Sequence, residues 1–225
     1  MTRINRAVLE RDGVRQAVRD SGHAHLLMSD DAVARSFADV MATHRPGAPI
    51  WIFGYGSLIW NPMMEYAARE PAQVHGYHRG FYIWSKINRG TPAVPGLVLA
   101  LDRGGSCRGI AYRLHPHSAA EDLRLLWRRE MVAGTYRAAW VTVNIGNRSL
   151  RAIAFVVRRD HPGYTGRLDD RRIVSIARTA VGQYGSCAEY LMNTAAGLEA
   201  AGIADARLSR LAKSVAQGLG ITPQS

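Results

Sequence analysis

Apolar and polar positions along the chain predict a central set of β-strands with helices toward both ends. The apolar run 50–53 enters Gly54-Tyr55-Gly56-Ser57, a pattern typical of a buried strand that ends in a tight loop. Turn-rich residues at 102–106 and 144–147 predict that the segments beside them pair as two hairpins. The predicted strands cover residues 50–53, 72–84, 97–101, 109–114, 140–143 and 150–157.

Helical spacing of apolar residues marks the remaining segments. Residues 1–28 show weak periodicity, which suits a surface helix or a partly ordered leader. The chain contains predicted helix starts at Ser29, Asp205, Ser118 (with Glu121) and Ser186 (with Glu189), and a further helix over 172–184. Strands that arrive as hairpins, with a helix between the pairs, imply a mixed or antiparallel sheet rather than a regular βαβ series.

The same pattern sets the expected domain organisation. No internal repeat and no low-complexity linker divides the sequence, so we expect a single domain over residues 1–225, with 1–48 as a helical N-terminal extension. A chain of 225 residues is long enough to bury a sizeable core. Because the strands are expected to pair as hairpins and the helices lie mainly outside them, the expected class is α+β.

The loop after the first strand is a candidate anion site. Glycine at positions 54 and 56 permits positive φ and removes the Cβ, so successive N–H groups can turn toward a carboxylate. The loop lacks the third glycine of a dinucleotide-binding motif and the Gly-Lys-Ser/Thr of a P-loop. On its own it is better interpreted as a glycine-bearing strand turn.

A carboxylate occupies a core-facing position of the helix that follows Ser118. Leu123, Leu126 and Trp127 form the apolar stripe, and Glu130 continues it, seven, four and three residues beyond them. Carboxylates are rarely buried without a partner, because loss of hydration raises the pKa. Glu130 is therefore either a general base and acid in a cleft or a member of a structural ion pair.

Two arginines, Arg129 and Arg137, are candidate partners in the ion-pair interpretation of Glu130. The presence of a ligand-cradling loop in the same chain favours the catalytic interpretation. Ser57 could act as a nucleophile, although a loop hydroxyl more often bonds its own backbone. Tyr164 and Tyr190 could bond a substrate, or could be buried with their hydroxyls satisfied by the backbone.

Composition adds a strong basic charge. The formal net charge is +11, and nearly all of the basic residues are arginine. The arginines are scattered, and no run of five basic residues occurs, so a solvated surface that attracts acidic ligands is favoured over a nucleic-acid partner. A non-enzymatic basic domain that binds RNA or a protein remains the alternative.

The remaining features indicate a cytoplasmic protein. No apolar run approaches the length of a membrane-spanning helix, and the basic start of the chain does not lead into the apolar region of a secretory signal. Cys107 and Cys187 are too few for a disulfide framework. Neither histidine pair, at 23/25 or 115/117, has the spacing of a zinc site, so no metal is expected.

Several motifs in order resemble the ChaC family of γ-glutamylcyclotransferases. The resemblance runs from about residue 50 to about residue 215 and includes Trp51-Ile52-Phe53-Gly54-Tyr55-Gly56-Ser57-Leu58-Ile59-Trp60-Asn61-Pro62, Gly109-Ile110-Ala111-Tyr112-Arg113, Leu126-Trp127-Arg128-Arg129-Glu130-Met131 and Glu189-Tyr190-Leu191. The resemblance implies a small mixed β-barrel or sheet surrounded by helices. Two departures, Pro95-Gly96-Leu97 and Ile87-Asn88-Arg89-Gly90, affect the expected substrate contacts near 86–97.

The resemblance also implies an activity. The family's glycine loop holds the γ-glutamyl part of glutathione, and the glutamate that matches Glu130 carries the proton. The substrate's own amine is the nucleophile, so neither a metal nor an organic cofactor is needed. Candidate substrate-binding residues are Tyr55, Gly56, Ser57, Leu58, Arg79, Tyr164 and Tyr190. Glutathione is the expected small-molecule partner, other γ-glutamyl amines are alternatives, and the oligomeric state is left open.

Overall fold

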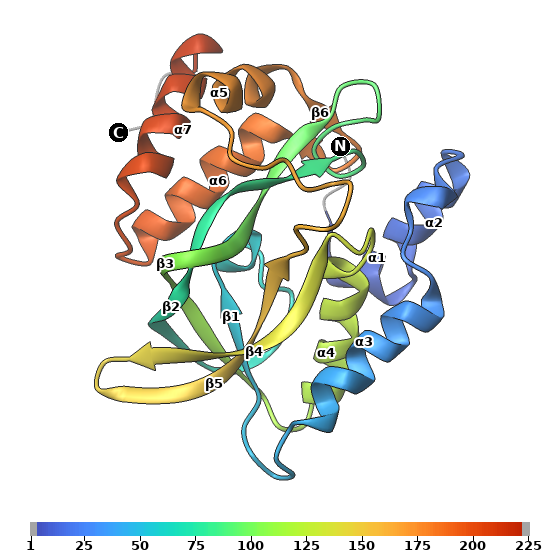
Figure 1. Ribbon diagram of the computed structural model, residues 1–225, viewed down its shortest axis with the longest axis vertical. Helices are drawn as coiled ribbons and strands as arrows, with labels where there is room; N and C mark the ends of the chain where they lie inside the picture. Colours follow the sequence, from blue (N-terminus) through green and yellow to red (C-terminus); the bar gives the residue numbers. More distant parts are fainter. Residues whose placement is uncertain (1–3, 222–225) are drawn as a thin grey trace.

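The computed structural model describes residues 4–221, which form a closed five-stranded β-barrel with helices packed around it (Figure 1). The barrel strands follow the order β1-β3-β2-β4-β5, and β1 and β3 both pair with β5 to close it. Their bounds are Trp51–Gly54 (β1), Tyr66–Ser85 (β2), Gly96–Leu114 (β3), Tyr136–Ile145 (β4) and Arg148–Val157 (β5). The expected barrel surrounded by helices is confirmed.

Strands β2 and β3 form one long antiparallel pair, so the predicted hairpin between 97–101 and 109–114 is wrong. Residues 102–106 continue β3 instead of turning. Gly104 and Gly105, with φ of 98° and 70°, lie opposite Gly76 in β2, where the register shifts. The two glycines form a bulge that bends the strand around the barrel. The second predicted hairpin, β4 with β5, is confirmed.

Seven α-helices occur in the described part of the chain, three of them before β1. They are α1 (Arg6–Glu10), α2 (Gly13–Asp20), α3 (Asp30–Ala42), α4 (Ala119–Glu130), α5 (Asp170–Thr179), α6 (Cys187–Ala200) and α7 (Ala206–Gly218). Short 3₁₀ helices cover Ala24–Leu26 and Ser57–Ile59. Figure 1 shows α5, α6 and α7 grouped on one side of the barrel, and α1 to α4 on another.

Three of the four predicted helix caps are confirmed. The side chains of Ser29, Ser186 and Asp205 each accept a hydrogen bond from the backbone N–H three residues further on. Ser118 occupies the N-cap position of α4 but makes no such bond, so its predicted capping box with Glu121 is wrong. Its backbone has φ −108° and ψ −5°, whereas a capping serine normally has extended backbone.

The helix predicted over 172–184 ends earlier than expected. α5 stops at Thr179 because Ala180 takes an extended conformation, and a two-stranded ribbon follows. The strands of this ribbon are β6 (Val181–Gly182) and β7 (Gly185–Ser186). Gly185, with φ 117°, allows the tight reversal that returns the chain toward α6.

Helix α4 packs its predicted stripe into the core. Leu123, Leu126 and Trp127 are at most 2% exposed, while Arg124 and Arg128 on the opposite side are exposed. The N-terminal helices pack on the far side of α4, where α1 and α2 bury apolar side chains against it. In residues 4–221, no helix is long and apolar enough to cross a membrane. The cytoplasmic location stays a prediction.

Candidate active site

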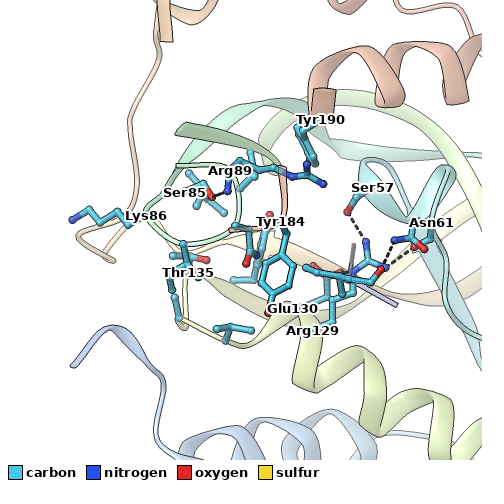
Figure 2. A pocket seen from close by; sticks show the side chains of 18 of the residues that line it. Ser57, Asn61, Ser85, Lys86, Arg89, Arg129, Glu130, Thr135, Tyr184 and Tyr190 are labelled. Carbon is cyan, nitrogen blue, oxygen red and sulfur yellow. Dashed lines mark hydrogen bonds and ion pairs between the residues drawn. The ribbon is translucent and has the colours of Figure 1, made fainter. Parts of the chain in front are cut away.

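A cavity of about 370 Å³ lies where the loop after β1, the end of β2, the end of α4 and the start of α6 meet (Figure 2). Its wall includes polar and charged side chains from all four segments. Among them are Ser57, Asn61, Ser85, Lys86, Asn88, Arg89, Arg129, Glu130, Glu189 and Tyr190. The cavity therefore joins the two elements that the sequence singled out, the glycine loop and Glu130.

The glycine loop has no room for larger residues. A Cβ on Gly54 would lie 3.0 Å from Leu58 Cβ and 3.1 Å from a ring carbon of Tyr112. A Cβ on Gly56 would lie 3.2 Å from the hydroxyl of Tyr190. The glycines thus let the chain turn closely between the barrel and α6, which brings Ser57 to the cavity wall while Leu58 is buried behind it.

Arg129 connects this loop to the end of α4. Its Nη2 donates to Ser57 Oγ at 2.7 Å and its Nη1 donates to the carbonyl of Asn61 at 2.5 Å. The Ser57 hydroxyl therefore accepts from a guanidinium. Because the two bonds span both ends of the short 3₁₀ segment, Arg129 fixes the loop relative to its sequence neighbour Glu130.

Glu130 lines the cavity with a side chain that is 13% exposed. Arg129 Nε lies 3.1 Å from Oε1, yet within the described residues Oε1 has no hydrogen-bond partner, so the contact is an ion pair without a directed N–H. Burial raises the pKa of Glu130, and the nearby charge of Arg129 opposes this shift. The carboxyl therefore holds a proton at higher pH than an ordinary glutamate.

Three tyrosines lie at the site, of which Tyr55 and Tyr190 are buried and Tyr136 is partly buried. Tyr190 lines the cavity, accepts a hydrogen bond from Leu99 N at 3.1 Å, and has a pKa that burial raises to about 12. Tyr136 also lines it and donates to Leu99 O at 2.8 Å. Tyr55 donates to the carbonyl of Phe155 from behind the wall. All three remain neutral phenols at physiological pH.

A family model described as ChaC-like protein matches residues 50–218, about three quarters of the chain. The chain belongs to the ChaC-like family. The matched region contains both the glycine loop and Glu130, and it begins after the three N-terminal helices.

Two curated relatives and one solved structure illustrate the relationship. The glutathione-specific γ-glutamylcyclotransferase of Escherichia coli strain K12 is 37% identical over 191 residues, 84% of this chain and 83% of the relative. Glutathione-specific γ-glutamylcyclotransferase 1 of Homo sapiens is 34% identical over 151 residues, 65% of this chain and 68% of the relative. A yeast γ-glutamylcyclotransferase specific to glutathione superposes with a TM-score of 0.70 at 24% identity, covering 76% of this chain and 97% of that one.

The cavity lining of this ChaC-like chain does not include five of the predicted site residues, namely Tyr55, Gly56, Leu58, Arg79 and Tyr164. Arg79 donates from Nε to Asp205 at 3.1 Å and from Nη1 to the carbonyl of Tyr55 at 3.0 Å. Tyr164 donates to Asp102 at 2.8 Å. Both groups are engaged in holding the barrel and its surrounding segments together, and their role in substrate binding stays a prediction, as does that of Tyr55, Gly56 and Leu58.

The structure adds wall residues that sequence reasoning missed. Asn88 and Arg89 lie in the 86–95 loop between β2 and β3, and the Arg89 side chain lies beside Glu189 and Trp60. In sequence, this loop stands out only by its departure from the ChaC pattern, which does not indicate which of its side chains face a ligand. Ile4 and Asn5, from outside the ChaC-like region, complete the wall.

Proposed function

We propose that this protein is a γ-glutamylcyclotransferase that converts glutathione into 5-oxoproline and Cys-Gly. Its ChaC-like relatives in Escherichia coli and Homo sapiens carry that activity and substrate in their names. The observation that carries the proposal is Glu130, an almost buried carboxyl with a raised pKa that lines the same cavity as the glycine loop. A binding module has no need of an acid in this position.

The reaction requires one internal displacement. The substrate's α-amine attacks its own γ-carbonyl carbon, a new C–N bond closes the five-membered lactam, and the amide C–N bond to cysteine breaks. Glu130 takes a proton from the attacking nitrogen and returns one to the departing nitrogen, so no water is consumed. One placed acid–base group contributes about 10² to 10⁴ in rate.

The cavity's second task is to hold the substrate folded. Holding an attached nucleophile against its target can lower the activation barrier by several of the roughly 7 to 11 kcal/mol that well-oriented intramolecular reactions gain. In this proposal the N–H groups of Gly56, Ser57 and Leu58 would anchor the α-carboxylate or stabilise the developing oxyanion. Because the nucleophile is part of the substrate, the proposed chemistry needs no covalent enzyme intermediate, metal or organic cofactor.

Product analysis tests the proposal. The protein is incubated separately with reduced glutathione, γ-glutamyl-alanine and γ-glutamyl-lysine, and 5-oxoproline and the released amine are quantified. We expect turnover of glutathione without added metal. Turnover of the other two compounds alone would make the protein a cyclotransferase of different specificity. Tight, salt-sensitive binding of random RNA without any turnover would replace the proposal by a nucleic-acid-binding function.

A further inference from the structure

Arg89 is a buried cation whose side chain faces the cavity. The residue is 9% exposed, and its guanidinium carbon lies 5.5 Å from the ring centre of Tyr190 and 6.0 Å from that of Trp60. Figure 2 shows the guanidinium beneath Tyr190, directed toward the side of the cavity where Ser57 lies. The two aromatic faces support it without supplying a hydrogen-bond acceptor.

One nitrogen of this guanidinium makes an ion pair but no hydrogen bond within the described residues. Nη1 of Arg89 is buried, and within the described residues it makes no hydrogen bond. The carboxylate oxygen of its ion-pair partner, Glu189 Oε2, lies 3.6 Å away, which is too long for a hydrogen bond. A buried charged donor without an acceptor is costly, and such a group at a cavity wall indicates a ligand that completes it.

The backbone around Arg89 is fixed by glycines. A Cβ on Gly182 would lie 2.5 Å from Arg89 N, and one on Gly185 would lie 2.5 Å from Arg89 Nη1. A Cβ on Gly96 would overlap the carbonyl of Arg89. The β6–β7 ribbon and the start of β3 therefore clamp the arginine, and the backbone N–H of Arg89 also donates to Ser85 Oγ at 2.9 Å. Such a held group meets its ligand with little further ordering.

The charges around the cavity favour an anion at this point. Burial lowers the pKa of Arg89, the carboxylate of Glu189 opposes this shift, and the charge of Arg129 adds a smaller lowering effect. A carboxylate bound at Nη1 would supply the directed acceptor that Glu189, at 3.6 Å, does not. The planar guanidinium fork matches a carboxylate, which it can hold through two parallel hydrogen bonds.

We propose that Arg89 binds the α-carboxylate of the γ-glutamyl group, which leaves the N–H groups of the glycine loop to the γ-carbonyl oxygen. This proposal rests on the proposed function. Glutathione has a second carboxylate, at its glycine end, but Arg89 stands against Tyr190, whose hydroxyl touches the Gly56 turn. The γ-glutamyl end must lie at that turn and near Glu130, so its carboxylate is the one within reach.

Two substrate analogues separate the carboxylates. 4-Aminobutanoyl-Cys-Gly lacks only the α-carboxylate and can still cyclise, giving 2-pyrrolidinone and Cys-Gly. The C-terminal amide of glutathione lacks only the glycine carboxylate. Values of kcat/KM are measured for both analogues and for glutathione with the wild-type protein, Arg89→Met and Arg89→Lys. Lys86→Met, which removes a cation from the same wall, is the matched control.

We expect Arg89→Met to lose about 10- to 100-fold in kcat/KM for glutathione, the range for a hydrogen bond to a charged group. The loss should persist with the C-terminal amide and disappear with the decarboxylated analogue, and Arg89→Lys should recover part of it. Lys86→Met should change kcat/KM for the decarboxylated analogue and kcat/KM for the C-terminal amide by the same factor. A loss that disappears with the C-terminal amide assigns Arg89 to the other carboxylate, and an equal loss with all three substrates makes it a packing residue. Either result overturns the proposal.

A binding measurement keeps the inference separate from the activity. 5-Oxoproline carries the former α-carboxylate and 2-pyrrolidinone does not, so calorimetry should detect binding of the first alone to the wild-type protein. Arg89→Met should weaken that binding. If glutathione is not turned over but 5-oxoproline binds through Arg89, the proposed function fails and the carboxylate site stands. Equal binding of both compounds removes the site.

Discussion

Burial raises the pKa of Glu130, and the arginine beside it, Arg129, directs no N–H at its carboxylate. Glu130→Gln keeps the shape of the side chain but cannot carry a proton. We expect kcat for glutathione to fall by at least about 10², with KM changing far less. Steady-state kinetics on the purified variant measure this. Normal turnover by a variant that has lost stability would make Glu130 a structural ion-pair member.

The same substitution has a pH-dependent effect on stability. Because burial raises the pKa of Glu130 above its ordinary value of 4.5, the ionised carboxyl destabilises the folded state. Below pH 4.5 the carboxyl is protonated in both the folded and the unfolded state, so it leaves the free energy of unfolding unchanged. As the pH rises through the raised pKa, the ionised carboxyl lowers the free energy of unfolding. Glu130→Gln should therefore raise Tm at neutral pH, and the gain should shrink as the pH falls toward 4.5. Thermal unfolding across this range tests it, and a pH-independent difference would contradict the assignment.

Single residues also mark the limit of what the sequence predicts about the site. Glu130 could be found because Leu123, Leu126 and Trp127 set the register of one regular helix. Arg89 could not, since its position depends on a loop packed against a ribbon about 95 residues away along the chain, and no periodicity encodes such a contact. Arg79 shows that a side chain can also have structural partners that the sequence does not reveal, because its guanidinium donates to Asp205 and to the carbonyl of Tyr55.

Helix α4 is tied to α1 through a fully buried acid that sequence periodicity did not single out. Asp122 accepts from Arg6 Nη1 at 2.6 Å and from the backbone N–H of Glu65 at 3.2 Å. Asp122→Ala leaves that amide without its acceptor and returns a partly exposed arginine to water. We expect a loss of about 1–3 kcal/mol in the free energy of unfolding, measured by urea titration.

Glu121→Ala is the matched control, since Glu121 contacts the same arginine at 3.0 Å but its side chain is 62% exposed. An exposed pair contributes roughly 0–1 kcal/mol, so this variant should stay near the wild type. Equal losses in the two variants would show that the charge on Arg6, and not the buried hydrogen bonds of Asp122, holds the helices together.

Strand β3 shows why element boundaries were harder to predict than element types. Local sequence at 102–106 is typical of a turn, and glycines with positive φ do occur there. The long partner strand β2 supplies hydrogen bonds across the irregularity, so the glycines produce a bulge in a continuous strand instead of a reversal. Pairing with a distant segment thus decided between two structures that the local residues permit equally.

At the scale of the whole molecule, the N-terminal helices share a packed apolar cluster with α4 and the cavity wall. Leu9 in α1 is 2% exposed and belongs to a cluster with Leu125, Val132 and Tyr184, the last two of which line the cavity. Leu9→Ala should lower the free energy of unfolding by about 2–5 kcal/mol, because it removes buried apolar atoms and leaves a cavity in the cluster. If residues 1–48 fold as part of one domain, thermal unfolding stays a single transition with a lower Tm.

Leu219→Ala removes the same atoms from a residue that is 41% exposed and provides the matched control. Its expected effect lies within about 0.5 kcal/mol. A separate low-temperature transition in Leu9→Ala, with the main Tm unchanged, would mean that the extension unfolds independently of the barrel.

Barrel closure has a consequence for the time course of folding. The strands β1 and β5 meet at Ile52 and Ile153, so closing the barrel orders a loop of about a hundred residues, whereas β4 and β5 are joined by a two-residue turn. We expect the hairpins to form early and closure to limit the rate. In pulsed hydrogen exchange during refolding, amides of β4–β5 should become protected before those of β1. Until then both closing edges remain unpaired, and this interval is when newly made chains are most prone to associate.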